Sequence, residues 1–596
     1  MSHRVAVLLA DRCQPRKCNQ ECISFCPPVR SGQTETIYMG EHGKPIISED
    51  LCIGCGICVN KCPYDALRII GLPEELKEDL VQRYGQNGFQ LFRLPVPRAG
   101  AATGILGPNG IGKTTSIRIL SGQEIPNLGE YEEEPTWEPV LETFRGTEIG
   151  DYLRMVVNEG VTTAVKPQYV DQLPKAFPGK KVEELLRGAD KDGRWDQVIP
   201  KLNIEHILSR QVDQVSGGEL QRIAIAATLL KEADVYFFDE PSSYLDIHER
   251  MRVARVIQEL AQEKRVLVIE HDLAVLDFLC DQIHLAYGTE GAYGVITPAR
   301  AVRHGINVYL EGYLPEENIR VREESITFEA KPPRNTAQMV SLLEFPPLEK
   351  DLGTFKISSN GGTIHAGEVV GVVGGNGTGK TTFVKMLANV LPPDNVELDH
   401  GVAVSYKPQY VKGDYDGTVR EMLLTEAPDL LQNGFSKAEI ARPLKLENLF
   451  EKQVKRLSGG ELQRVAVALC LYREADIYLL DEPSAYLDAN QRIVTAKTIR
   501  RVMEKKGRSA LIVDHDVYFI DLVSDSLMVF GGQPGVHGKA EGPFDLREGM
   551  NRFLAGVDVT FRRDNDTHRP RINKPGSRLD RQQREAGEYY YAPEDS

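Results

Sequence analysis

A set of nucleotide-binding motifs occurs twice in this 596-residue chain. A P-loop, GPNGIGKTT, spans residues 107–115 and returns as GGNGTGKTT at residues 374–382. Each copy follows a short apolar stretch and opens a helical pattern, the setting in which such a loop binds phosphate. Glycines let the backbone N–H groups curl around an anion at the N-terminus of a helix. The repeat therefore predicts two nucleotide-phosphate sites.

Further motifs follow both P-loops in the same order. Ser216 and Ser458 are separated by the same number of residues as Asp239 and Asp481, which indicates a duplicated unit. The two P-loops lie farther apart than that, so the first copy contains roughly 25 extra residues between its P-loop and Gln168. The repeated segments are KPQYV at 166–170 and 407–411, SGGELQR at 216–222 and 458–464, Asp-Glu-Pro at 239–241 and 481–483, SxYLD ending at 246 and 488, and a histidine after an apolar strand at 271 and 515.

Together these motifs resemble the ATP-binding-cassette (ABC) ATPases, which the LSGGE-like signature separates from other P-loop enzymes. The resemblance covers about residues 70–550. It implies an α/β fold of two ABC-type P-loop nucleotide-binding domains in tandem, facing each other head to tail around two ATP molecules. Each site would be composite, because the signature serine and glycine of one cassette would meet the P-loop of the other.

The residue types give each position a role. The P-loop lysine contacts the β- and γ-phosphates and the first threonine ligates Mg²⁺. The aspartate at the end of the buried strand holds Mg²⁺, and the adjacent glutamate orients or deprotonates the attacking water. The predicted catalytic residues are Glu240, Glu482, His271 and His515; the predicted Mg²⁺ contacts are Thr114, Gln168, Asp239, Thr381, Gln409 and Asp481; the predicted ATP contacts are Asn109, Gly110, Gly112, Lys113, Thr114, Thr115, Gln168, Ser216, Gly218, Asn376, Gly377, Gly379, Lys380, Thr381, Thr382, Gln409, Ser458 and Gly460.

The adenine base is expected to stack on an aromatic side chain upstream of each P-loop. The candidates are Tyr84 or Phe89 in the first copy and Phe345 or Phe355 in the second. An aromatic residue at such a position is equally typical of the core, so both interpretations stand for all four.

Eight of the ten cysteines lie within the first 62 residues. The second group of four is C-x₂-C-x₂-C-x₃-C-P, the bacterial ferredoxin run, in which the fourth cysteine binds the other of two clusters. The first group has longer gaps but also supplies four thiols followed by proline. We therefore expect a ferredoxin-like α+β domain with two [4Fe–4S] clusters, one held by Cys13, Cys18, Cys22 and Cys62 and the other by Cys26, Cys52, Cys55 and Cys58.

Other uses of these cysteines fit less well. Zinc sites usually pair two C-x₂-C units a dozen or more residues apart, and disulfides are rare where the cytosol keeps thiols reduced. The N-terminal apolar stretch reads as a strand and not as a signal peptide. No run of about 18 apolar residues predicts a membrane helix. We expect a soluble, cytoplasmic protein, and its net charge of −15 argues against general coating of nucleic acid.

The combination of cysteine-rich head and twin cassettes resembles the RNase L inhibitor family, subfamily E of the ABC proteins. The segments that carry the resemblance are RYG at 83–85, RLPVPR at 93–98, NGIGK at 109–113, KPQYVDQ at 166–172 and the insertion from WEPVL at 137–141 to FRG at 144–146 and YL at 152–153. The resemblance covers nearly the whole chain. It implies domains at 1–72 (iron–sulfur), 73–296 and 331–535 (cassettes), 297–330 (hinge or linker) and 536–596 (C-terminal hinge segment and tail). It also implies a helix–loop–helix insertion in the first cassette at about residues 135–160.

That family implies a function in ribosome recycling. ATP would close the cassettes, and closure would swing the iron–sulfur domain against a class-1 release factor or a Pelota-type rescue factor and so separate the ribosomal subunits. The expected partners are the small subunit with its rRNA and ribosomal proteins, and initiation factors, with a monomer outside the ribosome. The alternatives are an ATPase coupled to electron transfer through the clusters, the ATPase subunit of a membrane transporter, and an RNA-binding regulator with little catalysis.

The segment after the second cassette is locally basic. Between residues 562 and 585, eight Arg and Lys residues stand against four Asp and Glu residues. Such a balance is compatible with contact to RNA phosphates. A disordered tail is the competing interpretation, above all for residues 589–596.

Overall fold

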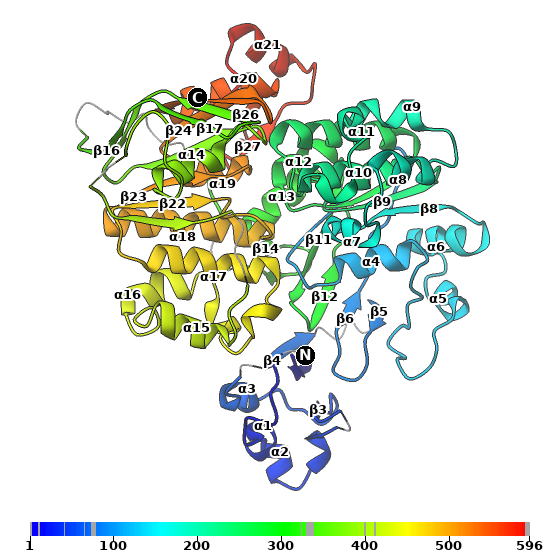
Figure 1. Ribbon diagram of the computed structural model, residues 1–596. Coiled ribbons are helices and arrows are strands. Elements are labelled where there is room, and N and C mark those ends of the chain that lie inside the picture. The colour runs from blue at the N-terminus through cyan, green and yellow to red at the C-terminus, as the bar shows by residue number, and fades with distance from the viewer. Residues whose placement is uncertain are drawn as a thin grey trace.

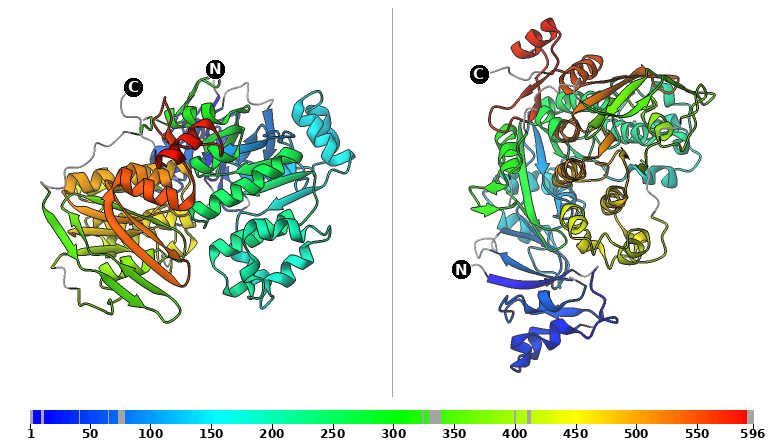
Figure 2. Two further views of the ribbon diagram at one scale, coloured as in Figure 1. Left: turned by 90° about the horizontal axis from the view of Figure 1, so that it is seen from above. Right: turned by 90° about the vertical axis from the view of Figure 1, so that its left-hand side faces the viewer.

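The computed structural model describes residues 3–9, 12–40, 42–64, 66–72, 79–322, 325–328, 339–398, 401–409 and 413–590. Figure 1 shows two α/β cassettes side by side, with a small N-terminal lobe at one end and helix α21 (Arg578–Ala586) at the other. The view from the side in Figure 2 places the lobe clear of the cassette bodies and the C-terminal segment at the opposite pole.

The first cassette is built on a mixed sheet whose centre is parallel. The strand order is β5-β6-β12-β11-β7-β10-β9-β8, and β13 pairs with β11. The central strands are buried along their whole length, as expected of strands covered on both faces. Their bounds are β5 (Leu80–Arg83), β6 (Gln90–Phe92), β7 (Ala102–Leu106), β8 (Thr163–Lys166), β9 (Val235–Asp239), β10 (Arg265–Ile269), β11 (Gln282–Thr289), β12 (Tyr293–Ile296) and β13 (Arg300–Ala301).

Helices cover this sheet and carry the motifs at their ends. The P-loop opens α4 (Lys113–Leu120), and the signature opens α10 (Gly217–Leu229). Two helices, α5 (Trp137–Thr143) and α6 (Glu148–Asn158), occupy the segment predicted as an insertion. The other helices are α7 (Leu173–Ala176), α8 (Val182–Ala189), α9 (Trp195–Val198), α11 (Ile247–Glu263) and α12 (Leu273–Leu279).

The second cassette repeats this design. Its sheet has the order β17-β18-β25-β24-β20-β23-β22-β21. The strands are β17 (Leu348–Asp351), β18 (Lys356–Ser359), β20 (Val369–Gly374), β21 (Val404–Lys407), β22 (Ile477–Asp481), β23 (Ser509–Val513), β24 (Ser526–Gln533) and β25 (His537–Asp545), with β16 (Ser341–Phe345) paired to β19 (Gly362–His365). The helices are α14 (Lys380–Leu387), α15 (Val419–Glu426), α16 (Gly434–Ser436), α17 (Gly459–Tyr472), α18 (Ala489–Lys506), α19 (Val517–Val523) and α20 (Leu546–Val557).

The N-terminal lobe is a small α+β unit. Strand β1 (His3–Leu8) pairs antiparallel with β4 (Leu67–Leu72), and β2 (Ile37–Met39) with β3 (Pro45–Ile47). Three short helices, α1 (Glu21–Ser24), α2 (Pro27–Arg30) and α3 (Ile57–Lys61), carry or adjoin the cysteines. The lobe is fixed to the first cassette, because the Asn87 side chain bonds both the N–H (2.7 Å) and the carbonyl (2.8 Å) of Ile47.

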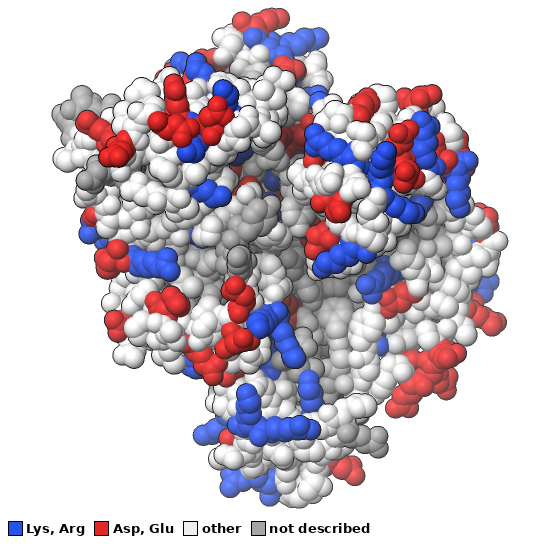
Figure 3. Space-filling model, in the orientation of Figure 1, with Lys and Arg blue, Asp and Glu red and all other residues white. Residues whose placement is uncertain are grey.

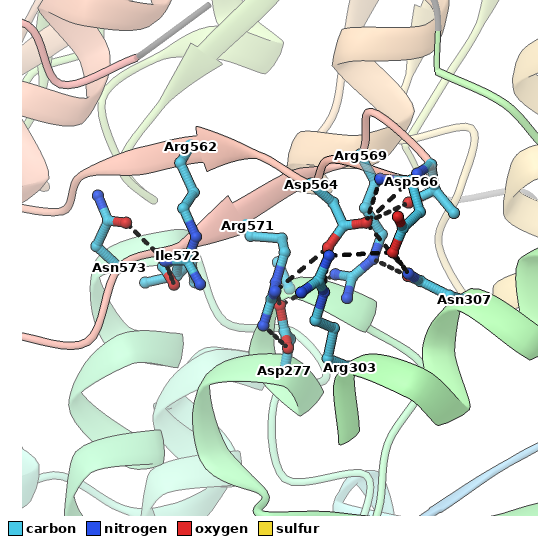
Figure 4. A network of polar contacts seen from close by, with 12 residues as sticks. Asp277, Arg303, Asn307, Arg562, Asp564, Asp566, Arg569, Arg571, Ile572 and Asn573 are labelled. Carbon is cyan, nitrogen blue, oxygen red and sulfur yellow. Dashed lines mark hydrogen bonds and ion pairs between the residues drawn. The ribbon is translucent and has the colours of Figure 1, made fainter. Parts of the chain in front are cut away.

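The linker and the C-terminal segment meet between the cassettes. The linker contains α13 (Val302–Glu311) and the strand pair β14 (Tyr313–Leu314) and β15 (Ile319–Arg320). The C-terminal segment contributes β26 (Phe561–Arg563) and β27 (Pro570–Ile572). Figure 4 shows the polar network that joins these parts: Arg569 and Arg571 both bond Asp277 at α12, and Arg303 of α13 bonds Asp564.

The same network reaches the second cassette. Arg563 makes two 2.8 Å bonds to Asp521 of α19, and Arg569 bonds the Tyr518 hydroxyl at 2.9 Å. The C-terminal segment therefore ties α12 of one cassette to α19 of the other. Most of the basic residues that suggested RNA contact bond to other groups of the protein, and Arg569 is fully buried. These residues are Arg562, Arg563, Arg569, Arg571 and Arg584.

The predicted end of the second cassette needs correction. Residue 535 falls in the turn between β24 and β25, which pair antiparallel within one sheet, so the cassette sheet extends to Asp545. The predicted boundaries near 72 and 330 adjoin residues outside the described part of the chain, as does residue 591 onward, and they stay predictions.

Within the described ranges, none of the helices is long and apolar enough to cross a lipid bilayer. On the face in Figure 3, acidic and basic side chains are interspersed over both cassettes, and Lys and Arg gather over the N-terminal lobe. On this face the two cassettes therefore present no large patch of one charge of the kind that binds polyanions in general.

Candidate functional site

Each P-loop wraps around its own lysine. The buried Lys113 ammonium donates to the carbonyls of Gly107 (2.9 Å) and Pro108 (2.5 Å). Lys380 donates in the same way to Gly374 (3.0 Å) and Gly375 (2.7 Å). Gly112 and Gly379 precede the helices with φ of 87° and 93°, a left-handed conformation that glycine adopts without strain. Both loops thus point a lysine and a helix N-terminus into one space, which suits phosphate.

The aspartates predicted to hold Mg²⁺ lie beside the P-loop threonines. The Thr114 hydroxyl donates to Asp239 at 2.8 Å. Burial, with a contribution from Glu240, raises the pKa of Asp239 to about 6. Burial likewise raises the pKa of Asp481 to about 6, and both of its carboxylate oxygens are buried without a hydrogen-bond partner. A buried carboxylate with free oxygens next to a hydroxyl is a donor set that fits a divalent cation.

The glutamate after each aspartate is held by two side chains. Gln168 donates to Glu240 Oε1 at 2.6 Å, and His271 Nε2 lies 3.4 Å from the same oxygen. Burial opposes ionisation of Glu240, but the nearby His271, Lys113 and Gln168 outweigh it and lower the pKa of the carboxyl. The carboxylate is therefore ionised at neutral pH and can accept a proton from water.

The second copy has the same geometry. Gln409 donates to Glu482 Oε1 at 2.8 Å, and His515 Nε2 lies 3.3 Å from it. Although burial works the other way, the bond to His515 lowers the pKa of Glu482 to about 2. The predicted glutamine, glutamate and histidine thus converge in both cassettes.

Both glutamates adopt an unusual backbone conformation. Glu240 has φ of 50° and Glu482 has φ of 49°. Left-handed backbone is uncommon for a non-glycine residue, and such strain clusters at active sites. Sequence alone does not reveal this turn, since nothing in the residue type requires it.

The cassettes face each other across the second P-loop. The backbone N–H of Asn376 donates to Asp246 at 2.7 Å, and the Asn376 amide donates to the Tyr244 carbonyl at 3.2 Å. A side-chain carbon placed on Gly218 would lie 3.7 Å from the Asn376 amide nitrogen. The signature of the first cassette therefore adjoins the P-loop of the second, as expected, although Asp246 makes the direct contact.

The first P-loop is approached less closely. Asn109 N–H donates to Asp488 at 3.4 Å. Ser458 caps its own helix through Glu461, and a side chain on Gly460 would first meet the Tyr486 carbonyl of its own cassette, 2.7 Å away. The contact predicted for Ser458 and Gly460 with the first P-loop stays a prediction.

All four aromatic candidates lie near a P-loop or its helix, but only Tyr84, Phe89 and Phe355 keep exposed surface. A side-chain carbon on Gly112 would lie 2.9 Å from the Phe89 ring, and one on Gly379 would lie 3.0 Å from the Phe355 ring. The Tyr84 hydroxyl donates to Glu124, just after α4. Phe345 is only 3% exposed and packs edge-on against Phe383, with ring centroids 5.7 Å apart, so it is removed from the candidates.

The cysteines line two separate cavities in the lobe. One is lined by Cys13, Cys18, Cys22 and Cys62, and the other by Cys26, Cys52, Cys55 and Cys58. This is the partition that the crossing rule predicts. Among the described residues, no three His, Cys, Asp or Glu side chains are placed to hold a single ion.

The thiols need a positive partner to ionise together. Burial raises the pKa of Cys22 to about 12, and the neighbouring Cys62 and Cys13 raise it further in the same direction. Burial and the charges of Cys52 and Cys55 raise the pKa of Cys58 to about 11. Sulfur ligands so close together become thiolates when iron neutralises them, so the donor set fits iron–sulfur clusters.

Family profiles match most of the chain. The profile described as ABC transporter matches residues 97–243 and 359–485, the one for a possible Fer4-like domain in RNase L inhibitor (RLI) matches residues 3–34, and the 4Fe-4S binding domain matches residues 45–68. A relative from Methanocaldococcus jannaschii, an uncharacterised ABC transporter ATP-binding protein, is 52% identical over 99% of this chain and 98% of its own length.

Two solved structures are similar at 52% identity. "Model of ribosome-bound archaeal Pelota and ABCE1" matches with a TM-score of 0.94 over 99% of this chain and 100% of that one. The complex of archaeal ribosomal stalk protein aP1 and archaeal ribosome recycling factor aABCE1 matches with a TM-score of 0.82 over 87% of this chain and 100% of that one.

The chain belongs to the RNase L inhibitor family, subfamily E of the ABC proteins.

As a member of the RNase L inhibitor family, the protein is an ATPase with two tandem ABC domains and an N-terminal ferredoxin-like domain. It carries iron–sulfur centres and uses ATP with Mg²⁺. The tandem cassettes and the cysteine-rich head, predicted from the motifs, are confirmed.

In this RNase L inhibitor family member, sequence reasoning missed the residues that make the direct contacts between cassettes. Asp246 and Asp488 were recognised only as the last residues of a repeated SxYLD segment. The repetition itself was the available signal. The SxYLD segment follows the Asp-Glu pair in both copies, which indicates that the two aspartates have the same function. The partner of each aspartate lies in the other cassette, which a linear pattern does not show.

Proposed function

We propose that this protein is an ATP-driven ribosome-recycling factor that separates ribosomal subunits after termination or rescue. In this proposal it acts in the cytoplasm as a monomer, together with a class-1 release factor or a Pelota-type factor. The small subunit, its rRNA and ribosomal proteins, and initiation factors are its further partners. The related structures named for ribosome-bound Pelota and for a ribosome recycling factor support this.

The observation that carries the proposal is that the N-terminal lobe contacts both cassettes. Asn87 and Arg83 bond it to the first cassette through Ile47 and Glu49. Gln14 donates to the Glu451 carbonyl of the second cassette at 3.2 Å. A body attached to two domains must shift when those domains move relative to each other. Closure of the cassettes would therefore displace the lobe.

The chemistry of closure follows from the site residues. In the first cassette Lys113 and the P-loop N–H groups would hold the phosphates, and Thr114 with Asp239 and Gln168 would hold Mg²⁺. Glu240 would orient water, with His271 fixing its carboxylate. Phe89 or Tyr84 would stack on adenine. In the second cassette Lys380, Thr381, Asp481, Gln409, Glu482, His515 and Phe355 would take these parts.

Two [4Fe–4S] clusters would give the lobe its rigidity. Cys13, Cys18, Cys22 and Cys62 would hold one cluster, and Cys26, Cys52, Cys55 and Cys58 the other. Each cluster would bind cysteines from both cysteine groups of the sequence. It would therefore link the segment around α1 to the segment around α3 and hold both against the β1–β4 pair. A rigid lobe would move as one body when the cassettes close and so displace a bound factor, whereas a flexible lobe would deform instead.

The test is subunit splitting. Protein made anaerobically is mixed with ribosomes, a release or Pelota-type factor and ATP, and the products are separated on a sucrose gradient. Free subunits that disappear with Cys58→Ser support the proposal. Intact ribosomes in every condition, with normal ATPase activity, contradict it and leave electron transfer as the reading to test by cluster redox titration during turnover.

A further inference from the structure

A buried lysine lies behind each Asp-Glu pair. Lys166 is the last residue of β8 and has no exposed surface. Its ammonium donates to the carbonyl oxygens of Asp239 (2.8 Å) and Glu240 (3.2 Å). These are the main-chain oxygens of the two residues whose side chains serve Mg²⁺ and water. Burying a charge is costly unless it is bonded in this way.

A second donor reaches the same turn from the signature helix. Gln221 of α10 donates to the Glu240 carbonyl at 2.6 Å. Two side chains from two elements thus fix the orientation of one peptide group. The rotation of that peptide determines the direction of the Glu240 side chain, because Glu240 is held at a positive φ that few residues adopt.

The second cassette repeats this arrangement in full. Lys407 of β21 donates to the carbonyls of Asp481 (2.7 Å) and Glu482 (3.3 Å). Gln463 of α17 donates to the Glu482 carbonyl at 2.5 Å. A buried lysine and a helix glutamine on the same carbonyl in both copies indicate a shared requirement.

The signature helix serves the opposite nucleotide site. Its first turn contains Gly218, which lies against Asn376 of the second P-loop. Gln221, one turn further along the same helix, bonds Glu240 of the first cassette. One rigid helix therefore connects the P-loop face of one site with the glutamate of the other.

We infer that Gln221 with Lys166, and Gln463 with Lys407, are positioning residues that aim the hydrolytic glutamate and couple it to the signature helix of the opposite site. This inference rests on the proposed roles of Glu240 and Glu482. Movement of α10 when the second site binds ATP would shift the Glu240 carbonyl directly.

The experiment isolates one site at a time. In a Glu482→Gln background the remaining hydrolysis belongs to the first site. There, Gln221→Leu is expected to lower kcat at least tenfold with the Kd for a fluorescent ATP analogue changed less than twofold. Lys166→Met should act in the same direction. The exposed Lys201, which pairs with Glu259, supplies the control for loss of one charge as Lys201→Met.

Gln463→Leu in the same background separates two explanations. Gln463 bonds the glutamate that has already been disabled, but it lies on the signature helix that is predicted to meet the first P-loop. A loss at least fivefold smaller than that of Gln221→Leu supports positioning through the carbonyl. Equal losses overturn the inference, because both residues would then act through their helices alone.

Folding and site assignment have their own readouts. Thermal unfolding and ATP binding show whether Lys166→Met remains folded. If it does not, the test rests on Gln221→Leu, which leaves the buried Lys166 charge in place. A folded Gln221→Leu protein with kcat within twofold overturns the inference. Activity retained by the Glu240→Gln/Glu482→Gln double variant would instead overturn the proposed catalytic roles.

Discussion

The Asp246 carboxylate of the first cassette accepts a 2.7 Å hydrogen bond from the backbone N–H of Asn376 in the second P-loop. The same carboxylate caps α11 by accepting from the Glu249 N–H at 3.0 Å. One side chain thus ends a helix in one cassette and contacts the phosphate loop of the other. The corresponding contact between Asp488 and Asn109 is longer, at 3.4 Å.

This asymmetry predicts unequal effects of matched variants. Asp246→Asn keeps a side-chain oxygen for the helix cap but loses the charge, and bonds to charged groups contribute about 1.5–3 kcal/mol. We expect ATPase kcat to fall roughly tenfold with little change in the thermal midpoint. Asp488→Asn should cost less. Steady-state ATPase assays decide, and a larger loss for Asp488→Asn would contradict the prediction.

The two glutamates predict a separation of binding from hydrolysis. Glu240→Gln/Glu482→Gln keeps the size of both side chains and removes the negative charge that orients water. ATP hydrolysis should fall at least about 100-fold, while binding of an ATP analogue persists because the P-loops are untouched. Loss of binding in parallel with activity would show instead that the substitutions disturb the fold.

His284 predicts part of the loss of stability in acid. Its Nδ1 lies 2.7 Å from the Thr297 carbonyl, and its Nε2 accepts from the Val96 N–H at 3.3 Å, so both contacts suit the neutral ring. Burial lowers the pKa of His284 to about 4; the charged groups nearest to it, Arg98 and Glu148, act in opposite directions.

In the unfolded chain the histidine has its ordinary pKa of 6.5, so the free energy of unfolding depends on pH. As the pH falls, the unfolded chain takes up the proton first. The stabilisation of the folded state by neutral His284 is therefore complete above pH 6.5 and is lost between pH 6.5 and pH 4. It amounts to roughly 3 kcal/mol. Thermal unfolding at pH 7.5 and pH 5.0 should show a smaller acid-induced drop for His284→Gln than for the unaltered protein, and equal drops would rule it out.

The Asp277 pair with Arg569 predicts a large cost when broken. Arg569 Nη1 lies 3.0 Å from Asp277, and both side chains are buried. Removing one partner of a buried pair costs about 3–5 kcal/mol, because the other charge is left without compensation. Asp277→Asn should therefore lower the thermal midpoint by several degrees.

A matched control is available in the same network. Arg303 also pairs with an aspartate, Asp564, but it is 46% exposed. Asp564 itself is buried but keeps a second partner in Arg571. A pair with an exposed arginine contributes about 0–1 kcal/mol, so Arg303→Met should shift the midpoint far less. Similar shifts for both variants would mean that burial does not set the cost.

The cysteine cavities predict the iron content of variants. Cys58→Ser should remove one of two clusters and halve the iron and sulfide per protein, while leaving the cavity of Cys13, Cys18, Cys22 and Cys62 intact. Cys280→Ala, which changes a buried thiol outside the lobe, should leave the iron content unchanged. Complete loss of iron with Cys58→Ser would indicate that the clusters depend on each other.

Sequence determined the chemistry of this protein, because that chemistry depends on residue types at short spacing. A P-loop, a signature or a C-x₂-C-x₂-C run works through neighbours in the chain, and their repetition predicted the tandem cassettes and both sets of cysteines. Tertiary structure decided everything that depends on packing between distant segments. Phe345 became a core residue, and Arg563 and Arg569 of the C-terminal segment were paired inside the protein. Asp246, Lys166 and Gln221 acquired their roles from partners at least 19 residues away. Burial and distance between such partners arise only when the chain folds, so no linear pattern specified them.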